Sequence, residues 1–206
     1  MAILRYELGP MDNNSFLIVD AASGDAAIVD PSFDSEAIWP EIEAHNYNVR
    51  YILNTHAHFD HIVQNAFFAE KTDAPIALHR ADLELLHLAP AQARLFGMEV
   101  APSPEPTIFL EDQQTLMLGE TKIKVLFTPG HSPGGVTFLV EDAALAGDCL
   151  FWDSIGRTDL PGGSQQTLLH SIRTQLLTLP DETQVLTGHG DLTTIGRERN
   201  SNPYLR

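Results

Sequence analysis

The stretch that decides the fold is Thr55-His56-Ala57-His58-Phe59-Asp60-His61, which follows directly on the short apolar run 51–53. It places three histidines and one carboxylate within six positions. Imidazoles crowded in this way would repel one another when protonated, so we expect a cation to hold them neutral. The spacing His-x-His-x-Asp-His therefore predicts a metal site at the end of a buried strand.

Three further segments end apolar runs with groups that can bind a metal, and each contains glycine. They are Thr128-Pro129-Gly130-His131, Ala146-Gly147-Asp148 and Thr187-Gly188-His189-Gly190. Glycine allows tight turns and close backbone approach, which loops that converge on one ion require. A lone His131 or His189 would be interpreted as structural. Beside the histidine cluster, however, we expect both to be metal ligands.

Elsewhere the sequence alternates between short apolar strands and amphipathic helices. We expect strands at 4–8, 15–20, 26–29, 51–53, 75–78, 122–127, 136–140, 143–145 and 183–186. Helices are expected from 34 toward 45, at 62–71, at 81–88 and from 164 to 179. No linker or low-complexity tract interrupts this order, so residues 1–206 are predicted to form a single domain. The pattern indicates a layered α/β sandwich whose strand-end loops carry the chemistry.

The regular pattern breaks between Ala89 and Pro106. Four prolines lie in this segment, around a short candidate helix that carries Leu95, Phe96 and Met98. A surface loop with a few tucked apolar groups and a lid that covers a substrate both fit such a segment.

Composition excludes several classes of protein. The chain has 12 Lys and Arg against 28 Asp and Glu, a net charge of −16, which repels nucleic acid. A single cysteine, Cys149, excludes an intramolecular disulfide framework and suits a reducing compartment. Because the sequence shows neither a leader peptide nor an apolar stretch of membrane-spanning length, we expect a soluble cytoplasmic protein with no membrane and no nucleic-acid partner. The oligomeric state stays open.

The order of these motifs resembles the metallo-β-lactamase superfamily. The resemblance rests on 55–61, on Pro129-Gly130-His131-Ser132-Pro133-Gly134, on Gly147-Asp148 and on Gly188-His189-Gly190. Within the superfamily, the stretch 156–163 (GRTDLPGG) and the ending 193–205 are similar to short single-domain bacterial hydrolases of the glyoxalase II (hydroxyacylglutathione hydrolase) type. The resemblance implies a four-layer αββα sandwich with a pair of metal ions at one edge.

The resemblance also implies a division of the ligands between two divalent ions. One ion would be held by His56, His58 and His131, the other by Asp60, His61 and His189, with Asp148 bridging them. Nitrogen and oxygen donors suit zinc first, with iron or manganese as alternatives. Cys149, next to the bridging carboxylate, is expected to point into the core instead of ligating a metal.

The implied activity is hydrolysis of a small-molecule thioester such as S-lactoylglutathione. A hydroxide shared by two ions would attack the thioester carbonyl, and Asp60 would also act as a catalytic residue that orients this nucleophile. Arg157 is the candidate for binding a substrate carboxylate, although an ordinary surface ion pair is an equal alternative. The chain ends 17 residues after His189. We therefore do not expect the helical domain that grips glutathione in two-domain glyoxalase II enzymes.

Other functions stay open. A persulfide dioxygenase of the same superfamily would use a single iron on His56, His131 and Asp148. A lactonase, a phosphodiesterase or a β-lactamase would share the hydrolytic metal site. A non-catalytic metal-binding module is disfavoured, because a structural zinc needs four closed ligands and not seven.

Overall fold

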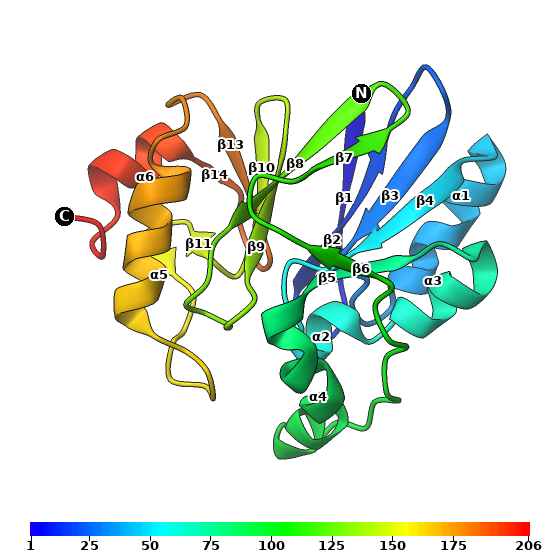
Figure 1. The fold of residues 1–206 in the computed structure, drawn as a ribbon, viewed down its shortest axis with the longest axis horizontal. Helices are drawn as coiled ribbons and strands as arrows, with labels where there is room; N and C mark the ends of the chain where they lie inside the picture. Colours follow the sequence, from blue (N-terminus) through cyan, green and yellow to red (C-terminus); the bar gives the residue numbers. More distant parts are fainter.

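Two six-stranded sheets face each other in the computed structural model, which describes residues 1–206 (Figure 1). The first sheet consists, in spatial order, of β1 (Ala2–Leu8), β2 (Asn13–Val19), β3 (Asp25–Val29), β4 (Asn48–Leu53), β5 (Ile76–His79) and β6 (Ile108–Leu110). The second consists of β14 (Thr193–Thr194), β13 (Gln184–Thr187), β10 (Ala143–Gly147), β9 (Val136–Val140), β8 (Thr121–Phe127) and β7 (Thr115–Leu118). The short strands β11 (Leu150–Phe151) and β12 (Ser154–Ile155) form a separate hairpin.

Helices cover both outer faces of this pair of sheets (Figure 1). The first sheet is covered by α1 (Trp39–His45), which continues the turn η1 (Ser35–Ile38), and by α3 (Asn65–Thr72). The second is covered by α5 (Gln165–Ser171), its π-helical continuation η3 (Ile172–Leu176) and α6 (Ile195–Ser201). At one end of the sandwich lie α2 (Phe59–Ile62), the turn η2 (Arg80–Asp82) and α4 (Leu83–Leu95). The predicted four-layer αββα sandwich is confirmed.

Alternation along the strands explains the layers, since successive side chains of a strand point to opposite faces. In β2, Phe16 joins a cluster of 17 buried residues between the sheets, whereas Leu17 packs toward α1 and α3. In β8, Val125 joins the same inner cluster, whereas Leu126 packs against α5. The alternation of apolar side chains, from which the strands were predicted, therefore also separates the core between the sheets from the two cores under the outer helices.

The helix predicted at 62–71 is wrong in its boundaries. The chain forms α2 from Phe59 to Ile62 and then a separate α3 from Asn65. The two are divided at Gln64, whose backbone N–H donates to the carbonyl of Pro31 at 3.0 Å. Because this N–H donates to Pro31, it does not donate to the carbonyl four residues earlier, and a single helix cannot run through Gln64.

The break predicted at Ala89 is also wrong, because α4 continues through Pro90 to Leu95. Proline removes one helical hydrogen bond and disfavours a helix interior. Here the buried face of the helix, with Leu86, Ala89 and Ala93 packed in one cluster, outweighs that loss. The helix predicted to begin at 164 starts with Ser164 as the N-cap of α5, and the Ser164 side chain accepts from the N–H of Thr167.

No helix combines the length and the apolar character that a bilayer crossing would need.

Candidate metal centre

The seven predicted ligands meet at one end of the sandwich, on loops that follow four strands. Parallel pairing of β10 with β13, and the two antiparallel steps from β8 through β9 to β10, bring three strand ends to the same edge of the second sheet. The loop after β4 reaches this edge from the first sheet. These loops carry, in chain order, His56, His58, Asp60, His61, His131, Asp148 and His189.

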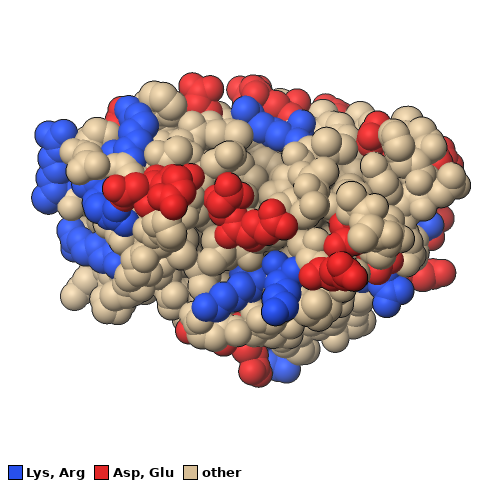
Figure 2. Space-filling view, turned by 90° about the horizontal axis from the view of Figure 1, so that it is seen from above, with Lys and Arg blue, Asp and Glu red and all other residues tan.

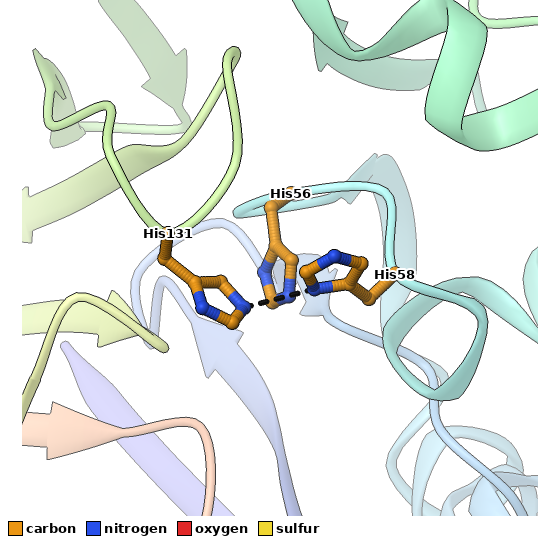
Figure 3. Close-up of side chains that lie close together, drawn as sticks. All are labelled: His56, His58 and His131. Carbon is orange, nitrogen blue, oxygen red and sulfur yellow. Dashed lines mark hydrogen bonds between the residues drawn. The ribbon is translucent and has the colours of Figure 1, made fainter. Parts of the chain in front are cut away.

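His56, His58 and His131 form the first cluster (Figure 3). All three are buried, and their candidate ligand atoms lie within 4.8 Å of one another. The Nδ1 of His58 lies 2.8 Å from the Nε2 of His131, the contact dashed in Figure 3. Two imidazole nitrogens this close need a proton or a metal cation to relieve the repulsion of their lone pairs.

Asp60, His61 and His189 form the second cluster, and Asp148 lies close to histidines of both clusters. The Nε2 of His189 is 3.3 Å from Asp60 Oδ2. Asp148 Oδ2 is 3.5 Å from the Nε2 of His131 in the first cluster and 3.6 Å from the Nε2 of His189 in the second. The carboxylate of Asp148 thus approaches both clusters.

Unpaired buried atoms test whether these residues fit a metal. The Nε2 atom of His56 and the Oδ1 of Asp148 are buried and have no hydrogen-bond partner. Such atoms are rare in folded proteins and call for an explanation. Imidazole nitrogens and carboxylate oxygens are the donors that zinc, iron and manganese take, so the donor set fits a divalent metal.

The protonation states of the first cluster agree with this fit. Burial lowers the pKa of His56 and brings that of His58 to about 3, which leaves both rings neutral, as ligands must be. Burial alone would also lower the pKa of His61, but the carboxylates of Asp60 and Asp148 and a hydrogen bond with Asp30 raise it to about 10. The second cluster therefore attracts positive charge, and a metal ion must displace the proton on His61 to bind there.

Backbone carbonyls orient two of the histidines. The Nδ1–H of His131 donates to the carbonyl of Arg157 at 2.8 Å, and the Nδ1–H of His189 donates to the carbonyl of Met11 at 2.8 Å. With Nδ1 used as a donor, each ring keeps the lone pair of Nε2 for the cluster, as in protein metal sites generally.

Asp30, at the end of β3, orients two more rings. Its Oδ2 accepts from the hydroxyl of Thr55 at 2.6 Å and lies 3.0 Å from the Nδ1 of His61. Because the Thr55 hydroxyl gives its hydrogen to Asp30, it accepts from the Nδ1–H of His56, 3.0 Å away. The Nε2 of His56 is therefore the unprotonated atom, and it is the atom without a partner.

Asp82 ties the two histidine loops together. Its Oδ2 accepts from the N–H of Ala57 at 3.1 Å and from the hydroxyl of Ser132 at 2.8 Å, and its Oδ1 accepts from the N–H of Gly134. Burial raises the pKa of this carboxyl group, although all three hydrogen bonds favour its charged form. Asp82 thereby fixes the loop after β4 relative to the loop after β8.

Sequence reasoning missed Asp82, Asp30 and Asn13, whose side-chain amide donates to Asp60 Oδ2 at 2.9 Å. Asp30 carried a usable signal, since it directly follows the apolar run 26–29, as Asp148 follows 143–146 after one glycine. Asp82 and Asn13 carried none beyond being polar. Cys149 is buried in the cluster under α5, and burial raises the pKa of its thiol to about 12, in agreement with the predicted core role.

Glycine is required where the loops touch. A Cβ on Gly188 would lie 2.1 Å from Asp148 Oδ1 and 2.9 Å from the Cε1 of His61, far inside van der Waals contact. A side chain at this position would therefore displace the carboxylate of Asp148.

Substitution Gly188→Ala should therefore reduce both bound metal and catalysis, with kcat/KM falling by about 100-fold, as expected for a displacement of about 1 Å in a catalytic group. Metal content per chain and steady-state kinetics measure this. Gly24→Ala is the control for an alanine placed away from the metal centre, because a Cβ there meets no atom within 4 Å. Its φ of +76° disfavours alanine, so this control should lose some stability but keep its metal and its activity. Equal behaviour of the two variants would contradict the prediction.

A cavity of about 140 Å³ opens onto both clusters. Besides the ligand side chains, its walls include Phe59 and Leu160 and, from the α4 segment, Gln92 and Phe96. The rings of Phe59 and Phe96 lie 5.4 Å apart, so the end of α4 packs onto the histidine motif. The segment 89–106, predicted to be a loop or a lid, thus supplies part of the cavity wall. Arg157 also lines the cavity, and its side chain is paired with Asp159.

Residues 8–189 match the family model described as the metallo-beta-lactamase superfamily. The chain belongs to this superfamily. A probable metallo-hydrolase of Bacillus subtilis, YqgX, is 40% identical over 98% of this chain and 96% of its own length. The hydroxyacylglutathione hydrolase GloC of Haemophilus influenzae is 37% identical over 87% of each chain.

Solved structures of the superfamily agree with the fold. The B3 metallo-beta-lactamase BLEG-1 superposes with a TM-score of 0.92 at 37% identity, and the superposition covers 99% of both chains. TTHA1623, solved in a di-iron-bound form, superposes with a TM-score of 0.90 at 37% identity over 98% of this chain and all of its own. Together with the His/Asp clusters, these relatives identify the chain as a metallo-hydrolase with a metal-binding site.

Proposed function

We propose that this metallo-hydrolase is a thioester hydrolase of the hydroxyacylglutathione hydrolase type with two divalent metal ions. The observation that carries the proposal is the carboxylate of Asp148, which lies within 3.6 Å of histidine nitrogens in both clusters, beside an open cavity. In the proposed site, the first ion binds to His56, His58 and His131, the second to Asp60, His61 and His189, and Asp148 bridges them. The likeness to GloC supports the substrate class.

Bound metal ions would supply a hydroxide nucleophile near neutral pH, because they lower the pKa of water from about 15.7 to near 7. The chain itself orients the reaction. Burial would raise the pKa of Asp60, but His61, His189 and Asn13 hold it below its usual range. Asp60 is thus an ionised acceptor at the cavity wall, able to orient the nucleophile, while Phe59 and Phe96 exclude water from the acyl group.

The leaving group fits the residues that are present. A thiolate, with a thiol pKa of about 8.5, needs little protonation as it leaves. The cavity lining offers no lysine or tyrosine that could serve as a separate general acid for a poorer leaving group. This favours thioesters over substrates that leave as alkoxides or amines.

Metal identity is part of the proposal and of its test. Zinc, iron and manganese all suit the nitrogen and oxygen donors, and the structure of TTHA1623 contains two irons. We expect any of these ions to restore activity to chelated protein, in a ratio of two per chain.

A substrate panel on protein of measured metal content tests the function. We expect hydrolysis of S-lactoylglutathione, loss of that activity on chelation, and little turnover of a chromogenic β-lactam, a lactone or a phosphodiester. Oxygen uptake with glutathione persulfide should be absent. One iron per chain together with oxygen consumption would instead establish the dioxygenase, and hydrolysis of only the β-lactam would establish a lactamase.

A further inference from the structure

Fixed positive charge is scarce where the substrate must enter. The chain carries 28 acidic against 12 basic side chains. Figure 2 shows acidic groups across the end of the sandwich opposite α2 and α4, away from the cavity, so the excess of negative charge is not confined to the site. Among the residues that line the cavity, Arg157 is the only lysine or arginine. Any carboxylate on a substrate therefore has one permanent cation to bind, and that cation is Arg157.

This guanidinium already holds a carboxylate. Its Nε donates to Asp159 Oδ1 and its terminal nitrogen donates to Asp159 Oδ2, both at 2.8 Å. Two parallel hydrogen bonds are the geometry in which arginine binds a substrate carboxylate. These hydrogen bonds lower the pKa of Asp159 to about 2, so the carboxylate is ionised throughout the physiological range.

The loop that carries this pair is fastened to the metal centre. The backbone carbonyl of Arg157 accepts from the Nδ1–H of His131. The N–H of Ser164 donates to the carbonyl of Gly130 at 2.7 Å. Between these anchors Gly162 packs against Pro133, where a Cβ would lie only 2.6 Å from the proline ring. The loop is therefore held at both ends, and the ion pair stays at the cavity.

We propose that Asp159 is a specificity-determining residue that competes with substrate carboxylates for Arg157. The inference rests on the thioester hydrolase function proposed above. Asp159 would weaken the binding of thioesters that bring a carboxylate to the cavity, including glutathione thioesters, which carry two, and would leave thioesters without a carboxylate unaffected. The side chains of Arg157 and Asp159 are 53% and 69% exposed, so their pairing is weak enough for a substrate to displace it.

Two thioesters with the same acyl group separate this effect from catalysis. S-Lactoylglutathione carries carboxylates, and S-lactoyl-N-acetylcysteamine carries none. In Asp159→Asn the ratio of their KM values, glutathione thioester over neutral thioester, should fall by about two- to fivefold, the range expected for an exposed ion pair. Glu99→Gln is the matched control, because it removes one exposed charge after α4 without touching the pair.

Binding without turnover provides a second readout. S-Methylglutathione cannot be hydrolysed as a thioester, and its calorimetric Kd should fall in Asp159→Asn by the same factor as the KM ratio. The double variant Asp159→Asn with Arg157→Gln should lose this gain, because the guanidinium that binds the carboxylate is gone.

The outcomes are distinguishable. If neither thioester is hydrolysed but S-methylglutathione binds Asp159→Asn more tightly, the competition stands and the proposed function fails. If the wild-type protein hydrolyses thioesters while Asp159→Asn changes neither the KM ratio nor the Kd, the competition is overturned. It is also overturned if Glu99→Gln gives the same gain, since the effect would then reflect net charge alone.

Discussion

Replacement of Asp148 by asparagine is expected to lower kcat/KM by about 10³-fold, the upper range for loss of one electrostatic group in an active site. Asp148 approaches nitrogens of both histidine clusters, at 3.5 Å in the first and 3.6 Å in the second. An amide of the same shape removes the negative charge between two proposed cations and can offer only one oxygen. We therefore expect the variant to bind fewer than two metal ions per chain.

Metal analysis and kinetics on the same preparation test this expectation. Asp142→Asn is the matched control, because Asp142 directly precedes β10 at the end opposite Asp148 and is exposed. The control should keep full metal and full activity. Asp148→Asn with two metal ions per chain and more than a tenth of wild-type activity would rule out the bridging role.

The candidate ligands could be found in the sequence because each stands in a local pattern. Asp148 and His189 follow apolar strands beside glycine, and a strand-end loop at the edge of a sheet is where side chains from distant segments meet. Asp82 has no such pattern. Its role arises only when η2 is packed between the loops after β4 and β8, so the sequence around it indicated a helix start and nothing more.

The incorrect predictions of helices and strands also arise from features that a local sequence pattern does not show. The helix α4 passes through Pro90 because tertiary packing of Ala89 and Ala93 outweighs local propensity. Strand β6 has three residues and follows a proline-rich segment, too short for a period of two to be recognised. Local patterns therefore predicted the candidate metal ligands better than they predicted the bounds of the helices and strands around them. The fold alone does not decide the substrate. The walls contributed by α4 and by the loop 157–163 are where substrate preference must be sought.

Replacement of Asp82 by alanine is expected to reduce the free energy of unfolding by about 3 kcal/mol or more, even without metal. The side chain accepts hydrogen bonds from Ala57, Ser132 and Gly134, and all three donors would lose their partner in a buried region. Each unsatisfied buried donor costs about 1–3 kcal/mol. The same loss would free the two histidine loops relative to each other, so metal affinity should fall by about 10- to 100-fold, as for other groups that orient ligands.

Urea unfolding of chelated protein measures the first effect, and competition with a metal indicator measures the second. Ser132→Ala is the graded control, because it removes one of the three donors and leaves the Asp82 carboxylate with two. It should cost about 1 kcal/mol. Asp82→Asn should fall between the two variants, since an amide keeps one acceptor oxygen but turns an N–H toward a former donor. If Asp82→Ala were as stable as Ser132→Ala and bound metal normally, the loops would be positioned by packing alone, and Asp82 would have no part in building the site.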